Sequence, residues 1–156
     1  MNLPPNEILI VLLAQVLFYE VAGAVIGHWH DDLRFWVRRV VERKRGADQK
    51  EAAEDSERAW ERIEFFHGHG FQFTLLTAFL VFVAANLKLS ALQKTLLSWT
   101  LVTSGTLYSL GWLFAGVLAL PWGRKKARRI ASYAFFTPFG VLFILSSVAL
   151  FLVAIL

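Results

Sequence analysis

Four long apolar stretches dominate the pattern of hydrophobic and polar positions along the chain. They cover about residues 8–27, 70–87, 95–120 and 130–156, and most charged residues lie between them. A helix needs roughly 20 apolar residues to cross a hydrocarbon core. Lipid cannot hydrogen-bond a free backbone, so we expect each stretch to be a membrane-spanning helix. The pattern predicts an all-α fold, an integral membrane four-helix bundle that covers residues 1–156 as a single domain.

The segment 28–69, between the first two spans, is polar but keeps a helical pattern. Four of its apolar residues recur at helical spacing: Leu33, Trp36, Val37 and Val40. We expect an amphipathic helix on the cytoplasmic membrane surface, with its basic face toward the lipid headgroups and its end at Gly46. A second helical segment over 48–64 is expected to lead into the second span, and the alternative is a solvated charged linker.

Composition agrees with a membrane protein and excludes some chemistry. Hydrophobic residues make up 56% of the chain and the mean hydropathy is +0.51, whereas soluble domains are roughly 45–50% apolar. The sequence has no cysteine, which excludes a disulfide framework, a thiolate metal site and a cysteine nucleophile.

The basic residues are distributed very unevenly among the loops. Nine Lys and Arg residues lie between the first and second spans and five between the third and fourth, against only Lys88 and Lys94 on the other side. Because basic loops face the cytoplasm, we expect both chain ends to lie outside it. The same rule accounts for the net charge of +4, so nucleic acid is not an expected partner, and the lipid bilayer is.

All four histidines fall at one predicted membrane boundary, where His28 and His30 end the first span and His67 and His69 begin the second. Together with Glu64 they are the ligand types of a zinc, iron or manganese site, so a transition-metal site is one hypothesis, with heme as a weaker one. Residues two apart on a helix point about 200° away from each other, which limits each helix to one ligand unless Gly27, Gly68 and Gly70 break the helices and bring the pairs together. The alternative is that these are boundary residues bonded to nearby carboxylates.

Glu20 is an acidic residue inside the first span, eight residues or about 12 Å from its cytoplasmic end. A carboxylate there is costly unless it is paired, neutral or hydrated, so we expect Glu20 to face the bundle interior as a neutral hydrogen-bond donor. Polar residues of the other spans lie at a similar depth: Thr74, Thr77, Tyr108, Ser109 and Thr137. This buried polar set predicts either an interhelical hydrogen bond or a pathway for protons or small solutes.

Short segments of all four spans resemble a known family in their order. They are Gly-Ala-Val-Ile-Gly-His at 23–28, Glu-Phe-Phe-His-Gly-His at 64–69, Ser-Gly-Thr-Leu-Tyr at 104–108 and Phe-Thr-Pro-Phe-Gly at 136–140. In this order they resemble the YgdD-like family of small four-helix membrane proteins of bacterial inner membranes, which has mitochondrial relatives. The resemblance implies a bacterial inner membrane, or alternatively the mitochondrial inner membrane, and it implies no biochemical activity. It marks matching positions: His28, His67 or His69, Ser104, Gly105, Tyr108, Thr137 and Pro138.

These observations favour a protein that is not an enzyme. No serine has a histidine at matching depth, and the close spacing of Gly23 and Gly27 is an ordinary helix-packing feature. We therefore expect an accessory or scaffold subunit that assembles with other membrane proteins or with itself. The alternatives are a metal- or heme-binding membrane protein that uses the histidines, and a proton or small-solute pathway through Glu20.

Overall fold

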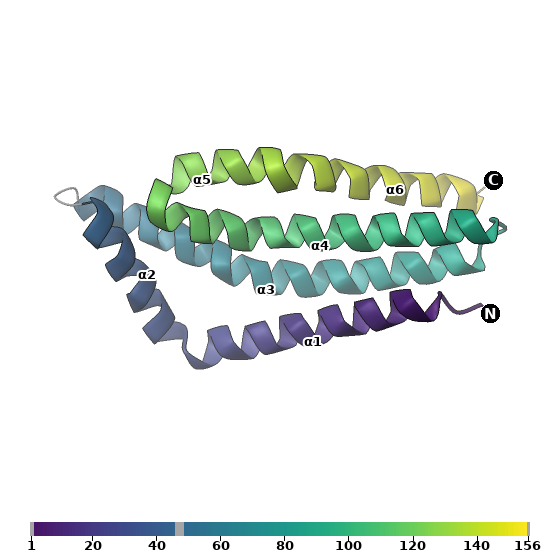
Figure 1. Ribbon diagram of the computed structural model, residues 1–156, viewed down its shortest axis with the longest axis horizontal. Helices are drawn as coiled ribbons and strands as arrows, with labels where there is room; N and C mark the ends of the chain where they lie inside the picture. Colours follow the sequence, from purple (N-terminus) through teal and green to yellow (C-terminus); the bar gives the residue numbers. More distant parts are fainter. Residues whose placement is uncertain (1, 46–48, 156) are drawn as a thin grey trace.

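The structure, a computed structural model, describes residues 2–45 and 49–155. Within these ranges the chain forms helices and short connections, with no strand. In chain order the elements are α1 (Asn6–His28), α2 (His30–Arg45), α3 (Gln49–Asn86), α4 (Ala91–Trp122), α5 (Arg124–Ala131), the π-helix η1 (Ser132–Phe136) and α6 (Thr137–Ile155). Figure 1 shows α1, α3, α4 and the α5–η1–α6 run along the long axis of the molecule, with the two chain termini at the same end.

Four helical segments are long and apolar enough to cross a membrane: α1, α3, α4 and the continuous run Arg124–Ile155. This confirms the predicted all-helical fold with four apolar helices. The helices are longer than the apolar stretches, because α3 is one helix of 38 residues that joins the charged segment to the second stretch. The linker alternative for 48–64 is therefore wrong for its described part, while Asp48 lies outside the described residues.

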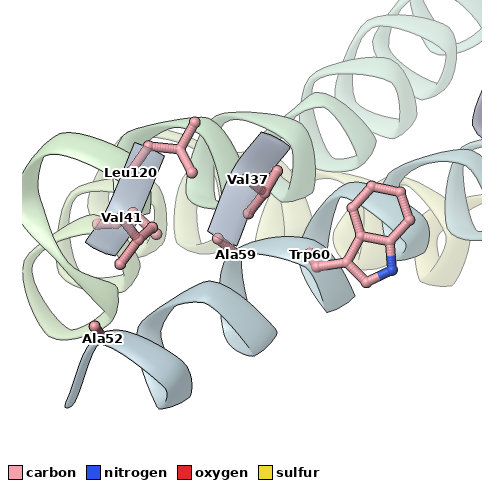
Figure 2. Packing of buried hydrophobic residues seen from close by; sticks show 8 residues of the cluster. Val37, Val41, Ala52, Ala59, Trp60 and Leu120 are labelled. Carbon is pink, nitrogen blue, oxygen red and sulfur yellow. The ribbon is translucent and has the colours of Figure 1, made fainter. Parts of the chain in front are cut away.

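One end of the molecule carries most of the charge, and we call it the polar end: α2, residues 49–69 of α3, and residues 112–131 of α4 and α5. Its core is a cluster in which Val37 and Val41 of α2 pack with Trp60 of α3 and Leu120 of α4. Figure 2 shows these side chains close together between the three helices. Burying each valine contributes roughly 1.5–3 kcal/mol to the stability of the fold. The α2 helix is therefore packed stably against α3 and α4.

The packed face of α2 differs from the predicted one at a single residue. Val37 is buried and Leu33 and Val40 pack against the same cluster, but the Trp36 side chain is 54% exposed and Val41 takes its place. Because α3 and α4 cover the apolar face of α2, that face is not available to a membrane surface. The helix ends at Arg45, and the predicted terminator Gly46 lies outside the described residues.

The remainder of the bundle, which we call the apolar half, comprises α1, residues 70–86, residues 91–111, η1 and α6. Its core cluster draws on all four long helices: Ile8, Leu12, Val81, Leu101, Val102 and Phe143. A capping box starts α4, because the Ser90 hydroxyl accepts a hydrogen bond from the Gln93 amide and the Gln93 side chain accepts one from the Ser90 amide. The tight connection from α3 to α4 therefore follows from local sequence.

Small residues let the helices of the bundle approach closely. A Cβ added at Gly70 would lie 2.0 Å from the ring of Tyr19, and one at Gly23 would lie 2.3 Å from the ring of His67. By contrast, a Cβ added at Gly27 would meet no atom within 4 Å. The two glycines predicted to act as a pair therefore behave differently, and only Gly23 is needed for packing within the chain.

The fourth apolar helix widens into η1 at Ser132–Phe136 before it continues as α6. Pro138 explains this widening, because it has no N–H for the carbonyl four residues earlier and its ring would collide with that carbonyl. Instead the Thr137 amide donates to the Ser132 carbonyl five residues back. The distortion before Thr137 and Pro138 thus takes the form of a π-bulge, a feature often found at functional sites.

Candidate functional site

A groove of about 770 Å³ opens where the polar end meets the apolar half, between α3, α4 and the α5–η1 run. Five of its lining residues are basic: Arg58, Arg62, Arg124, Lys125 and Arg128. Four are aromatic: Phe65, Tyr108, Trp112 and Phe136. Glu61, Ala115 and Ser132 complete the lining. The combination of cations with rings suits a ligand that has an anionic part and an apolar part.

The cations and the rings occupy different levels of the groove. Along α3 the basic positions 58 and 62 precede the ring at 65, and along the α5–η1 run the basic positions 124–128 precede the ring at 136. The α4 helix runs the opposite way, and its rings at 108 and 112 come before its end at the charged turn. The cations therefore lie toward the polar end and the rings toward the apolar half.

Arg62 is a half-buried cation of the groove. Its guanidinium donates a hydrogen bond of 3.2 Å to the Ala115 carbonyl, which ties α3 to α4. Arg62 precedes the apolar part of α3, and burial lowers the pKa of its guanidinium, while the positive charges of Arg128 and Arg58 push that pKa further down. Like charges gathered this closely raise the energy of the protein and make the groove attractive to an anion.

Carboxylates compensate part of this charge. Glu61 accepts a hydrogen bond of 2.6 Å from Arg58. Arg124 forms a 2.5 Å ion pair with Glu54, and its backbone amide donates to the buried carboxylate of Asp55 at 3.2 Å. Asp55 thus reaches from α3 to the first turn of α5, where a negative charge complements the helix dipole.

The rings form a connected wall. Trp112 lies with its ring centroid 5.6 Å from that of Phe65, 5.2 Å from that of His69 and 4.9 Å from that of Phe136. The ring of Tyr108 in turn contacts Phe136 at 5.4 Å. The indole N–H of Trp112 is buried and has no hydrogen-bond acceptor, the only such buried side-chain atom among the described residues. The aromatic wall therefore contains one hydrogen-bond donor without an acceptor, the Trp112 indole N–H, close to the cations of the groove.

The sequence alone did not identify this groove. Its cations lie in two segments that are about 60 residues apart along the chain. From the sequence, these cations indicated only which loops face the cytoplasm. A usable signal was present, because Arg58 and Arg62 are one helical turn apart and Phe65 follows three residues later on the same face. Only the packing of α5 beside α3 and α4 brings the second set of cations to the first.

The four histidines predicted as metal ligands are not brought together. His28 packs on Trp29, His67 lies against Gly23 of α1, and His69 lies against Trp112 of α4. Across 2–45 and 49–155 no three histidine, aspartate or glutamate side chains are grouped so that they could hold a metal ion. The predicted set of His28, His30, His67, His69 and Glu64 therefore does not converge, because His28 ends α1 while His30 begins α2, and His67 and His69 point in different directions on α3.

His30 instead joins two carboxylates at the start of α2. One ring nitrogen lies 2.9 Å from Asp31 and the other 3.1 Å from Glu64 of α3. Hydrogen bonding to Asp31 raises the pKa of His30, burial opposes the rise, and the bond to Glu64 adds to it. The ring also packs edge-on against Trp60. For His30 this arrangement matches the alternative that the boundary histidines bond to neighbouring carboxylates.

Glu20 differs most from expectation, because its side chain is exposed on the outer face of α1 rather than buried in the bundle. Its neighbour Tyr19 is the residue that enters the interior, where it is buried. One position along a helix turns the side chain by about 100°, so both residues cannot face inward. The prediction of an interior Glu20 is therefore wrong, and a proton or small-solute pathway through Glu20 stays a prediction.

The other members of the predicted buried polar set divide between interior and surface. Thr74, Thr77 and Ser109 are buried, Tyr108 is half-buried, and Thr137 is exposed. A different polar contact crosses between α1 and α4, where the Gln15 side chain donates to the Thr106 hydroxyl at 2.6 Å. The interior hydrogen bond that was expected of Glu20 is therefore made by Gln15, which lies five positions earlier on another face of α1.

Comparison with known proteins adds no identification: no family model, no curated protein and no solved structure matches the chain. The resemblance to the YgdD-like family therefore has no support from these comparisons, and it stays a prediction from short segments.

Proposed function

We propose that the chain is a multi-pass membrane protein that acts as a scaffold or accessory subunit of a membrane-protein assembly, and that α1 docks against α1 of a second copy. The observation that carries this proposal is that Glu20 is exposed within the apolar span of α1. A carboxyl group that faces hydrocarbon costs several kcal/mol, about 2.5–3.5 kcal/mol at the centre of a span. A partner helix that supplies a hydrogen bond removes most of this cost.

Glu20 belongs to a regular stripe on the exposed side of α1. The stripe consists of exposed residues that alternate at steps of four and three: Leu13, Leu17, Glu20, Ala24 and Gly27. This is the spacing of the contact seam in a pair of parallel helices. Packing within the chain does not require a glycine at position 27, since a Cβ added there would meet no atom within 4 Å. Its small size therefore suits close approach by another helix.

A second copy is the partner that this stripe fits. Two copies in one membrane have the same orientation, so α1 would meet α1 in parallel around a two-fold axis, with each residue opposite its equivalent. The two Glu20 carboxyl groups then lie at the same depth, where neutral carboxyl groups can donate to each other. A single polar residue in an apolar seam also fixes the register of the pair.

Cysteine cross-linking in membranes tests the α1 pair, because the chain has no cysteine of its own. Ala24→Cys lies in the stripe, and Val25→Cys is exposed on the same helix but lies about 100° around it. We expect a dimer-sized product from Ala24→Cys and little from Val25→Cys. Equal cross-linking at both positions, or none at either, would contradict the proposal.

Substitution of Glu20 tests whether the proposed α1 pair depends on a hydrogen bond of this residue or only on apolar packing. In the Ala24→Cys background, Glu20→Gln should retain cross-linking, because the amide can both donate and accept hydrogen bonds. Glu20→Leu should reduce it several-fold, because the polar contact is lost. If Glu20→Leu cross-links as well as the parent, Glu20 plays no part in the assembly.

The same approach tests the proposed insertion and orientation. We propose a bacterial inner membrane with both chain ends outside the cytoplasm, supported by the unequal distribution of basic residues. A cysteine at Lys88 should then react with an impermeant maleimide from outside intact cells, and one at Lys126 should react only after the cells are opened. The reverse pattern would invert the orientation, and labelling of both sites in intact cells would contradict it.

A further inference from the structure

The basic groove between α3, α4 and the α5–η1 run has more positive charge than its carboxylates compensate. Arg58 is paired with Glu61, and Arg124 is paired with Glu54. The remaining three cations of the lining, Arg62, Lys125 and Arg128, form no ion pair within the described ranges of the chain, although the charges of Glu61 and Asp55 attract Arg62 from a greater distance. The groove is therefore built around an uncompensated positive charge that an anion would neutralise.

The position of these cations favours a ligand that enters from the membrane. Arg62 lies one turn before Phe65 on α3, and Arg128 lies two turns before Phe136 on the α5–η1 run. In both cases the ring is on the side of the apolar stretch. A ligand whose anionic group meets the cations thus has its next atoms beside aromatic rings and then beside apolar helices.

The wall of the groove also holds an unused donor. The buried indole N–H of Trp112 has no acceptor, and the aromatic ring of Trp112 contacts both Phe65 on α3 and Phe136 on η1. A buried donor without an acceptor is costly, and a ligand oxygen at this level would relieve that cost. The π-helical turn that contributes Ser132 and Phe136 is a second irregular feature of the same wall.

We propose that this groove binds the anionic phosphate headgroup of a membrane lipid, with the headgroup at Arg62, Lys125 and Arg128 and the start of the acyl chains along the rings. Guanidinium groups bind phosphate oxygens through two parallel hydrogen bonds, and basic pockets between helices at the cytoplasmic membrane face are suited to anionic headgroups. The inference rests on the membrane insertion proposed above, but not on the α1 pair.

A matched pair of substitutions on α5 tests the site. Arg128 lines the groove, whereas its neighbour Arg129 is equally basic and exposed but is not part of the lining. Arg128→Gln and Arg129→Gln therefore remove the same charge from the same helix. Because Arg128 is exposed, both variants should fold, which a helical circular dichroism spectrum and an unchanged elution volume will check.

Binding can be measured by fluorescence quenching in the full chain. The protein is placed in phosphatidylcholine nanodiscs, and brominated phosphatidylglycerol is titrated against brominated phosphatidylcholine at equal mole fractions. Bromine quenches nearby tryptophan, and the difference between the wild type and Trp112→Phe isolates the signal of Trp112. We expect phosphatidylglycerol to quench Trp112 at a mole fraction about tenfold lower than phosphatidylcholine does.

The variants decide how the result is read. Arg128→Gln should weaken the quenching by phosphatidylglycerol about tenfold, because one charge-assisted contact is lost, while Arg129→Gln should change it by less than about twofold. Equal quenching by both lipids, or equal effects of both substitutions, would overturn the proposed site. Such a result would leave the α1 cross-linking unaffected, so the two proposals fail separately.

Free phosphate is the other source of the same anionic chemistry. Inorganic phosphate added to the nanodiscs at millimolar concentration should leave the phosphatidylglycerol quenching nearly unchanged, because it lacks the acyl chains that the rings contact. If phosphate abolishes the quenching at these concentrations while an equal ionic strength of chloride does not, the groove is a phosphate site and the lipid assignment is overturned.

Discussion

The polar end and the apolar half share the helices α3 and α4 but are stabilised by different interactions. At the polar end, charged groups define the geometry: Asp55 is buried against the first turn of α5, and Arg34 on α2 donates two hydrogen bonds, of 2.9 and 2.8 Å, to Glu57 on α3. In the apolar half, rings lie directly on glycines, as Tyr19 does on Gly70.

This difference follows from the surroundings proposed for each part. Water drives apolar side chains together at the polar end and also solvates the outer groups of its ion pairs. Lipid supplies no such drive between helices, so association there depends on close fit and on a few hydrogen bonds. The helices α3 and α4 thus combine ion pairs and water-driven apolar packing at one end with close steric fit at the other. The basic groove lies where these two kinds of packing meet.

The largest effect is expected at the polar end, from Asp55→Ala. The substitution removes a buried carboxylate and leaves the amide and guanidinium of Arg124 without it, so the free energy of unfolding should fall by about 3 kcal/mol. Unfolding by increasing SDS in mixed micelles measures this loss. Glu54→Ala is the control, because that ion pair is partly exposed and should be worth less than about 1 kcal/mol.

Close packing should fail next, in both parts of the molecule. In Gly116→Ala the new Cβ would lie 2.9 Å from the Ala59 carbonyl, and in Gly70→Ala it would lie 2.0 Å from the Tyr19 ring. Each should cost about 1–3 kcal/mol of unfolding free energy through overpacking. Gly27→Ala has open space around it and should cost nothing. If Gly27→Ala destabilises the monomer as much as the others, the close approaches described above are not what limits stability.

A smaller effect is expected from the hydrogen bond that crosses the apolar half. Thr106→Val removes the acceptor of the Gln15 side chain and should lower the unfolding free energy by about 0.6–1.7 kcal/mol. Thr100→Val is the matched control on the same helix, since the Thr100 hydroxyl donates only to the Leu96 carbonyl of its own helix. Equal losses in the two variants would show that the contact between α1 and α4 adds nothing specific.

The smallest effect is a pH dependence at the polar end. The pKa of His30 is raised above its usual 6.5 by Asp31 and Glu64, so the protonated ring favours the folded state. This stabilisation is fully present below about pH 6.5 and is lost as the pH rises through the raised pKa. The difference in unfolding free energy between wild type and His30→Gln should therefore shrink from pH 5.5 to pH 9. A difference that does not change over this range would contradict the role given to the protonated His30 ring.

Several features of the fold could be predicted from local sequence. The number and character of the apolar helices follow from hydropathy over about 20 residues, which depends only on the chain itself. The amphipathic α2 was likewise evident from its spacing, but Val41 is buried in place of Trp36, because both are apolar and flank the same stripe on opposite sides. The spacing of apolar residues identifies the buried stripe of a helix to within about one residue. The shape of the helices packed against it decides which residues lie at the centre of that stripe.

The candidate site was less predictable. The histidines appeared to be a set because they fall at one predicted membrane boundary, yet they pack against different neighbours, for example His67 on Gly23 and His69 on Trp112. Glu20 appeared to be interior because a buried acid is usual in a membrane bundle, whereas the rotation of α1 gives that place to Tyr19. Rotation about a helix axis is set by packing, and hydropathy alone does not determine it when the helix is apolar all round.

What the sequence determined by itself was therefore one-dimensional: four apolar helices, an amphipathic segment between the first two, and an unequal distribution of charge along the chain. What only the tertiary structure decided was which side chains meet. Arg62 and Arg128 are 66 positions apart in the chain, yet they line one groove because α5 folds back beside α3 and α4. Contacts between distant residues depend on how helices pack and rotate, and those choices are made by shape and charge across the whole bundle.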